Sequence, residues 1–228
     1  MNDIDAIGAL QDPVRRRLYE YVVAQGREVG RNEAAEATGV ARTLAAHHLD
    51  RLAEAGLLDT GSRRLTGRSG PGAGRPAKVY TRARAERIVS LPARDYRTAA
   101  ELLAEAAEQA GLDAGLCAAA RRRGEALRGS AAPCGDLREA MEILAARGYE
   151  PRLEEGAGAA PDAVRMRNCP FHAVAERFPP LVCGMNLALL EGLLGADGPV
   201  RARMDARPGE CCVVLETSGE GASKNNVD

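Results

Sequence analysis

The sequence predicts an α+β protein with an N-terminal winged helix-turn-helix, a helical connector and a small α+β domain. Three observations lead to this fold class. The first 85 residues hold three helical patterns followed by two short strand patterns, residues 95–148 hold three more helical patterns, and period-two alternation begins near residue 149. With 228 residues, the chain is long enough to build two hydrophobic cores.

These patterns divide the chain into four predicted parts. Residues 1–85 form the winged helix-turn-helix, residues 86–148 a helical connector with a dimerisation region, and residues 149–217 the α+β domain. Residues 218–228 are polar and are predicted to be a disordered tail.

The first part carries the start and stop signals of three helices. Asp12 is a predicted N-cap with Pro13 at the first helical position, and Asn32 is the predicted cap of a short second helix that ends at Gly39. The third helix stops at Gly56. Its predicted inner residues are Leu44, His48, Leu49 and Leu52. A short helix, a tight turn and a longer helix make a helix-turn-helix.

Two strand patterns follow the third helix and predict a wing. "LLDTG" and "AKVYTRA" flank residues 62–76, a segment rich in Gly, Pro and Arg. Between residues 60 and 85 there are seven basic side chains and no acidic one. The wing is therefore a predicted phosphate-binding element.

The third helix has a polar face opposite its apolar side, and this face is predicted to enter the major groove of double-stranded DNA. Arginine can bind guanine through two hydrogen bonds, and threonine or alanine can touch a thymine methyl group. The predicted DNA-contacting residues are Arg42, Thr43, Ala46, His47 and Arg51 of the helix, beside Asp50, and Arg63, Arg64, Arg68, Arg75 and Lys78 of the wing.

Charge is distributed unevenly along the chain. Residues 1–85 contain 14 basic and 10 acidic side chains, whereas residues 86–228 contain 17 basic and 22 acidic ones. The predicted DNA-binding part is thus net positive and the remainder net negative.

The helix predicted after Asp95 carries a stripe of small and aliphatic residues. The stripe comprises Ala99, Leu102, Leu103, Ala106 and Ala110. Two interpretations stay open: the stripe is the seam of a homodimer, or it docks onto its own domain.

The compartment can be inferred from what the chain lacks. No apolar run reaches the ~18 residues needed to cross a bilayer, and the N-terminus has no signal-peptide pattern. We therefore expect a cytoplasmic protein without membrane partners, in which the six cysteines are free or bound to a metal.

The last part is predicted to hold two strands at residues 149–155 and 163–168, a helix at 178–195 and a hairpin at 200–216. Cys211 and Cys212 are neighbours in the second strand of that hairpin. Because adjacent strand residues point to opposite faces, only one of the two is predicted to reach a shared site.

Three segments carry a specific resemblance. "DPVRRRLYEYV", "HHLDRLAEAGLL" and "GPGAGRPAKVY", within residues 6–82, resemble the ArsR-like winged-helix regulators. The similarity is to the branch of iron-sulfur-responsive repressors of cluster-assembly operons. This resemblance implies a homodimeric transcription regulator, a repressor, that binds an imperfectly palindromic DNA operator.

The segments "NCPFHAVAERFPPLVCGMNLALLEGLL" and "GECCVVLE" resemble the sensor half of the same branch. The resemblance implies an iron-sulfur cluster held by Cys169, Cys183 and one of Cys211 and Cys212. Soft thiolates are the ligands that such clusters prefer. The fourth ligand stays open between His172, solvent, a small thiol and none.

Other interpretations of these cysteines remain. The same residues could hold zinc or another metal, or they could be buried or redox-reactive thiols without a metal. A regulator with a small-molecule effector pocket is a further alternative. An enzyme with Cys169 as nucleophile and His172 as base lacks a catalytic framework, so we expect no enzyme. Cys117 and Cys134 lie outside the candidate site.

Overall fold

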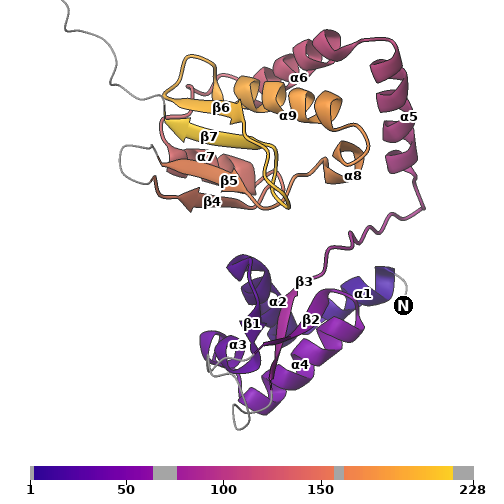
Figure 1. Ribbon diagram of the computed structural model, residues 1–228, viewed down its shortest axis with the longest axis vertical. Helices are drawn as coiled ribbons and strands as arrows, with labels where there is room; N and C mark the ends of the chain where they lie inside the picture. The colour runs from indigo at the N-terminus through magenta and orange to yellow at the C-terminus, as the bar shows by residue number, and fades with distance from the viewer. Residues whose placement is uncertain (1–2, 64–75, 157–161, 218–228) are drawn as a thin grey trace, which may run out of the picture. The chain divides into compact units, whose positions relative to one another are not determined.

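The computed structural model describes residues 3–63, 76–156 and 162–217, and the chain divides between Arg94 and Asp95 into two compact units. Both units combine helices with antiparallel strands (Figure 1). The tail predicted at residues 218–228 lies outside the described residues. None of the described helices is both long enough and apolar enough to cross a membrane.

The first unit is a helix-turn-helix completed by a small sheet. It contains α1 (Asp3–Gly8), a 3-10 helix (Ala9–Gln11), α2 (Pro13–Gln25), β1 (Val29–Gly30), α3 (Arg31–Thr38), α4 (Arg42–Glu54), β2 (Leu58–Arg63) and β3 (Ala77–Arg82). The strand order is β1-β3-β2, and both pairings are antiparallel. Three residues separate α3 from α4, and the β2–β3 pair forms the wing.

The helix starts in this unit follow local capping. The Asp12 carboxylate accepts hydrogen bonds of 2.9 Å from the backbone N–H groups of Val14 and Arg15, as predicted for an N-cap. The prediction of Asn32 as the next cap was wrong. Gly30 pairs with Val79 in the sheet and is itself the cap of α3, so the helix starts directly after the strand.

The core of the first unit packs α2, α3 and α4 against β3. Leu49 and Leu52 are buried as predicted, and His48 is 7% exposed. The prediction for Leu44 was wrong, because this side chain is 44% exposed. The next residue, Ala45, is fully buried with Leu49 and Leu52, so Leu44 lies outside the face of α4 that meets the core.

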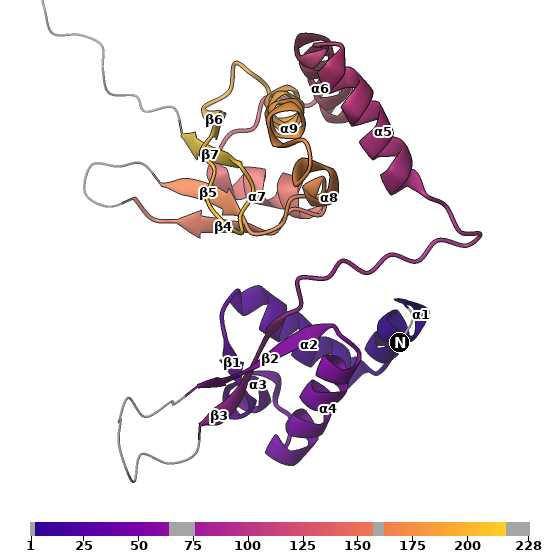
Figure 2. The same cartoon turned by 45° about the vertical axis from the view of Figure 1, so that its right-hand side comes forward.

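The second unit is a four-stranded sheet with helices. It contains α5 (Tyr96–Gln109), α6 (Asp113–Arg128), α7 (Leu137–Ala145), β4 (Pro151–Glu154), β5 (Ala163–Met166), α8 (His172–Ala175), α9 (Pro179–Leu194), β6 (Val200–Met204) and β7 (Val213–Thr217). The strand order is β4-β5-β7-β6, with every pairing antiparallel. Residues of α7 and α9 share one apolar core with β5, β6 and β7 (Figure 2).

The structure places the boundary between the two parts differently from the prediction. Of the segment predicted as a connector, 86–148, only the stretch up to Arg94 groups with the first unit. Helix α6 packs along α9, and Leu137 and Leu144 of α7 lie in the core beside the sheet. The helices after Asp95 therefore belong to the second unit.

Two glycines allow α6 and α9 to approach closely. A Cβ atom at Gly192 would lie 2.2 Å from the carbonyl oxygen of Arg121, and one at Gly124 would lie 2.2 Å from the carbonyl oxygen of Leu189. No side chain fits at either position without moving a helix backbone. This contact fixes the position of α9 relative to α6.

Candidate functional site

The exposed face of α4 brings together the side chains predicted to read DNA. Arg42, Thr43, His47 and Arg51 are exposed, and Ala46 between them is partly buried. Leu44 joins this surface, since it is exposed in the first turn. An apolar side chain there can contact a thymine methyl group.

A groove of about 750 Å³ lies between the start of α3, the start of α4 and the wing. Its lining residues are Arg31, Asn32, Arg42, Thr60, Gly61, Ser62, Pro76, Ala77 and Lys78. Three of them are cationic, so the groove suits a phosphate-bearing strand. Arg31 and Asn32 were absent from the predicted set because the sequence assigned them only to the start of a helix.

Asp50 connects three elements at the edge of this groove. Its carboxylate accepts hydrogen bonds of 2.7 Å from Lys78 Nζ and from the hydroxyl of Tyr80, and of 2.7 and 3.0 Å from Arg31 Nη2. The Tyr80 hydroxyl in turn accepts a hydrogen bond of 2.9 Å from Arg31 Nε. Helix α3, helix α4 and strand β3 are thereby tied together.

The ionisation of this cluster follows from its contacts. Burial opposes the charge on Asp50, but hydrogen bonds from Lys78, Tyr80 and Arg31 outweigh it and lower the pKa of Asp50 to about 2. Burial and the Asp50 carboxylate raise the pKa of Tyr80 to about 12. Asp50 is thus a carboxylate that orients the cations of the groove, and Lys78 is already partnered.

The other predicted wing residues are only partly described. Arg63 lies 3.5 Å from the Glu28 carboxylate and keeps 62% of its side chain exposed. Arg64, Arg68 and Arg75 lie outside the described residues. On α4, Arg51 pairs with Glu54 at 2.9 Å, so Arg42 is the arginine of the reading face that also lines the groove.

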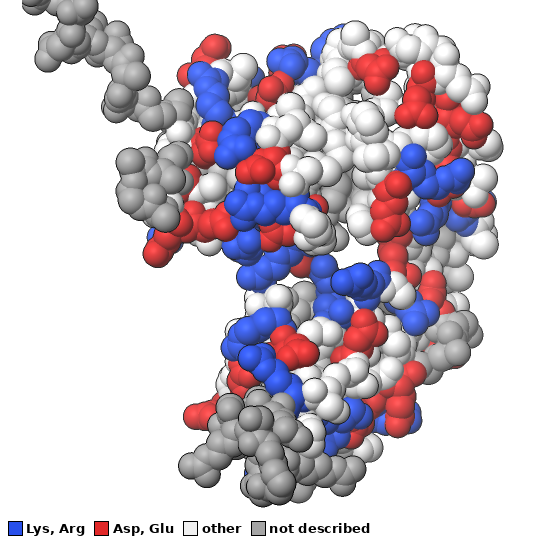
Figure 3. Space-filling view, in the orientation of Figure 1, with Lys and Arg blue, Asp and Glu red and all other residues white. Residues whose placement is uncertain are grey.

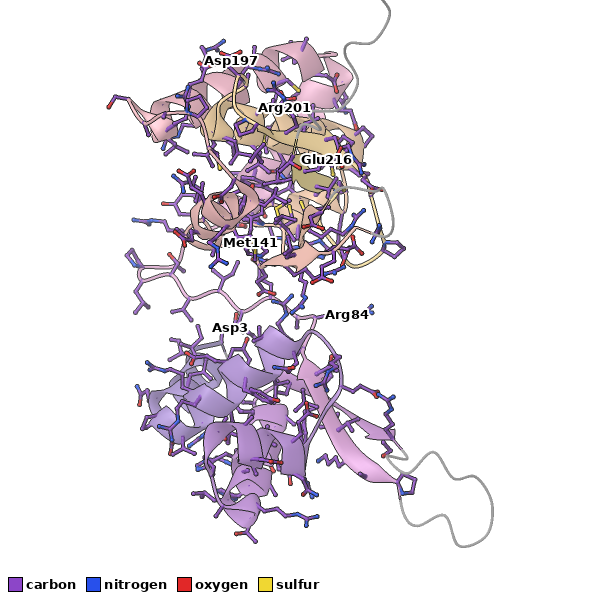
Figure 4. The ribbon with its side chains drawn as sticks, turned by 90° about the vertical axis from the view of Figure 1, so that its left-hand side faces the viewer. Asp3, Arg84, Met141, Asp197, Arg201 and Glu216 are labelled. Carbon is purple, nitrogen blue, oxygen red and sulfur yellow. The ribbon has the colours of Figure 1, made fainter. Side chains whose placement is uncertain are left out.

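Four cysteines converge in the second unit. The sulfur atoms of Cys183 and Cys212 lie 2.8 Å apart, and the thiol of Cys169 is hydrogen bonded to the sulfur of Cys211. Cys183 also interacts electrostatically with Cys169 and with Cys211. Figure 4 shows sulfur atoms gathered inside this unit.

The prediction that Cys211 and Cys212 lie in the last strand was wrong. Strand β7 begins at Val213, so neither cysteine lies in the regular strand where neighbours alternate. The N–H of Cys211 donates to the carbonyl oxygen of Met166, and the carbonyl oxygen of Cys212 accepts from Asp205. This irregular backbone turns both sulfurs toward cysteines of the site.

The four thiols differ in their tendency to ionise. The hydrogen bond with Cys211, together with burial, raises the pKa of Cys169 above its usual range. Burial raises the pKa of Cys183 to about 12. The hydrogen bond from Cys169, with others from Asn186 and the backbone, lowers the pKa of Cys211 to about 7. Cys211 is thus the thiol whose anion is best stabilised.

His172 does not join the cysteines. Its side chain is 66% exposed, and its Nε2 atom lies 3.1 Å from the Glu176 carboxylate one helical turn away. The prediction of His172 as a ligand is therefore corrected by the structure. Cys134 also lies apart, since its thiol donates to the carbonyl oxygen of Asp136 at 3.3 Å.

Within residues 3–63, 76–156 and 162–217, no group of three or more His, Cys, Asp or Glu side chains is arranged to hold one metal ion. The four sulfurs instead form two contacting pairs. A single tetrahedral ion needs its ligands about equally disposed around one point, whereas Cys183 and Cys212 are in direct contact with each other.

The segment that carries Cys211 and Cys212 is anchored by ion pairs on the outer face of the sheet. Arg165 of β5 is 2% exposed and contacts the carboxylates of Glu154, at 2.8 Å, and Asp205. Arg152 pairs with Glu210 at 2.6 Å. Basic and acidic side chains alternate over this sheet (Figure 3). These contacts hold the segment at both of its ends.

Replacing Asp50 by Asn should destabilise the first unit in a pH-dependent way. The carboxylate has a pKa of about 2 in the folded chain, below that of an unfolded aspartate, so it stabilises the fold above about pH 4 and loses this effect toward pH 2. We expect a loss of about 1 kcal/mol at neutral pH, a modest value because the side chain is a third exposed.

Urea unfolding of the full chain, followed by circular dichroism between about pH 2.5 and pH 7, measures this difference. Asp59→Asn is the matched control, since Asp59 is an exposed carboxylate of β2. An Asp50→Asn effect that stays constant across this pH range would contradict the role given to the carboxylate.

Comparison with known proteins identifies the first unit. Residues 10–61 match a family model described as a helix-turn-helix domain. No curated protein and no solved structure matches the chain. The matched segment spans α2, α3, α4 and most of β2, which are the elements that form and support the reading face. The chain thus carries a helix-turn-helix DNA-binding domain, which indicates a transcriptional regulator.

Proposed function

We propose that this protein is a homodimeric, ArsR-like winged-helix repressor whose second unit responds to an iron-sulfur cluster, or to the redox state of the thiols that would hold it. The observation that carries the proposal is the convergence of Cys169, Cys183, Cys211 and Cys212 from three separate segments. In this proposal both Cys211 and Cys212 are ligands, which would supply the fourth thiolate that the sequence left open.

The donor set fits an iron-sulfur cluster. Four thiolates are the usual ligands of such clusters, and burial around the sulfurs influences the reduction potential. The cysteines come from the loop after β5, from α9 and from the segment before β7, so they surround a site rather than follow one another along a strand. Cys183 and Cys212 would each supply one thiolate to the cluster.

The other interpretations have less support. The hollow beside α9 and β6 measures about 100 Å³, below the ~300 Å³ of a typical small-molecule pocket. For an enzyme with a Cys169–His172 pair, the two side chains would have to face each other. Cys169 contacts Cys211 instead, and His172 contacts Glu176.

Self-association through α5 would give the regulator two reading heads. Ala104 and Ala107 of α5 pack against the cluster around Phe178, whereas Leu102 and Leu103 are 62% and 72% exposed. The stripe predicted at Ala99, Leu102, Leu103, Ala106 and Ala110 is exposed throughout. Docking onto its own unit uses the other face of α5, so the stripe is left for a second copy of the chain.

Arg42→Ala should weaken DNA binding. Arg42 both lies on the reading face and lines the groove, so we expect a lower affinity for the DNA upstream of the protein's own gene. We also expect the slope of log affinity against log salt to fall by about 1. Arg122→Ala, which removes an exposed arginine of α6, is the control and should bind as the wild type does.

Footprinting at low salt and fluorescence anisotropy across a salt series measure these effects. The regulator proposal fails if the wild-type protein protects no DNA in that region, with or without added iron and sulfide.

Leu103→Glu should shift the protein from dimer to monomer, because a charge would be buried at the seam. Sedimentation velocity at several concentrations measures the change. Glu108→Lys, an exposed position on the side of α5 opposite Ala99, also changes the charge of the helix and should leave the dimer intact. A wild-type chain that sediments as a monomer at every concentration would rule out this seam.

Serine at any one of the four cysteine positions should remove the cluster or sharply reduce its content. Anaerobic purification followed by visible absorption and by iron and sulfide assays measures it. Two controls should retain the cluster: Cys117→Ser, and His172→Ala at an exposed side chain. A colourless wild-type protein whose DNA affinity is unchanged by Cys169→Ser would point to thiols that are merely packed.

A further inference from the structure

Asn186 is a polar side chain in the middle of an apolar helix. It lies on α9, is 2% exposed, and has Met185 and Leu187 as neighbours in the chain. A buried amide is costly unless its oxygen and nitrogen are both hydrogen bonded. Both partners of Asn186 are therefore informative.

The amide of Asn186 bridges Tyr149 and Cys211. Its Oδ1 atom accepts a hydrogen bond of 2.5 Å from the Tyr149 hydroxyl, and its Nδ2 atom donates one of 3.4 Å to Cys211 Sγ. The two contacts fix which way round the amide lies. In this arrangement the amide oxygen faces the hydroxyl and the N–H group points at the sulfur.

Tyr149 is itself held firmly. Its side chain is 4% exposed and belongs to the same core as Leu144 and Cys211. Burial raises the pKa of Tyr149 well above its usual range, so its hydroxyl stays protonated and remains a donor at neutral pH. Tyr149 thus donates to the amide oxygen of Asn186, at the end opposite the N–H group that donates to Cys211.

The sulfur of Cys211 has several N–H hydrogen-bond donors around it. Besides Asn186, the backbone N–H groups of Cys212 and Val213 are directed at its sulfur. In the part of the chain that the structure describes, no asparagine or other amide side chain donates in this way to Cys183 or Cys212. One end of the cysteine site is therefore much richer in N–H donors than the other.

We propose that Asn186, oriented by Tyr149, is a positioning residue that raises the reduction potential of the group held at Cys211. An N–H···S hydrogen bond withdraws electron density from the sulfur and stabilises the reduced, more negative state of a cluster. The proposal rests on the proposed function, since it concerns the cluster that the four cysteines would bind. Because Asn186 donates to Cys211, the hydrogen bond would act on the reduction potential through the Cys211 sulfur.

The test is a reductive titration of the anaerobically purified protein, followed by visible absorption. Asn186→Leu keeps a similar volume but has no donor, and it should shift the midpoint potential downward. Tyr149→Phe keeps the ring and its packing but frees the amide, and it should shift the potential in the same direction by a smaller amount. Met185→Leu, at the adjacent position of α9, is the control and should leave the potential unchanged.

The outcomes separate the two proposals. A wild-type protein that binds no cluster overturns the proposed function, and this inference with it, before any variant is compared. A wild-type cluster whose potential is unchanged in both Asn186→Leu and Tyr149→Phe overturns the inference alone. If Asn186→Leu fails to fold, Tyr149→Phe decides, because an unchanged potential in that variant would overturn the role given to the amide.

Discussion

The close contact between α6 and α9 is the constraint on which the second unit depends. At Gly124 and Gly192 each helix meets the other's backbone, at a distance that leaves no room for a side chain. Helix α9 therefore lies deep enough to be covered by α6 on one side and by the sheet core on another. Since α9 carries both Cys183 and Asn186, this backbone contact determines where these two side chains lie.

In both units, one charged side chain with several partners holds neighbouring elements together. In the first unit Asp50 gathers Arg31, Lys78 and Tyr80, so that the reading helix and the wing strand share one anchor. In the second unit the buried guanidinium of Arg165 binds Glu154 and Asp205 beside the cysteine-bearing segment. A charge with several partners restricts its neighbours more than a single surface ion pair does.

Local signals made much of the fold predictable from the sequence. Asp12, Pro13 and the apolar spacing of Leu18, Leu49 and Leu52 act within a few residues, and the structure has the predicted helices there. The predictions for Leu44 and Asn32 were wrong for two reasons. The burial of Leu44 depends on which face of α4 meets the core, and the cap of α3 depends on where β1 ends. Both are set by contacts distant in the sequence.

The candidate site was less predictable, for the same reason. The residue types at Cys169 and Cys183 indicated thiolate chemistry, but strand alternation suggested that Cys211 and Cys212 diverge. The strand begins three residues later than the pattern indicated, and Cys211 and Cys212 lie in the irregular segment before it, each beside another cysteine. Asn186 carried one signal, an amide in an otherwise apolar helix, whose meaning required knowing that Tyr149 and Cys211 lie on either side of it.

The separation of the four cysteines along the chain has a consequence for biosynthesis. Cys169 and Cys183 leave the ribosome well before Cys211 and Cys212, and the latter pair is positioned only when β7 has joined the sheet. A nascent chain that ends before Cys211 contains only Cys169 and Cys183 of the four. Loading of any group at the four sulfurs would therefore follow synthesis of the last strand, and a chain truncated before Cys211 would keep the helix-turn-helix but lack two of the four thiols.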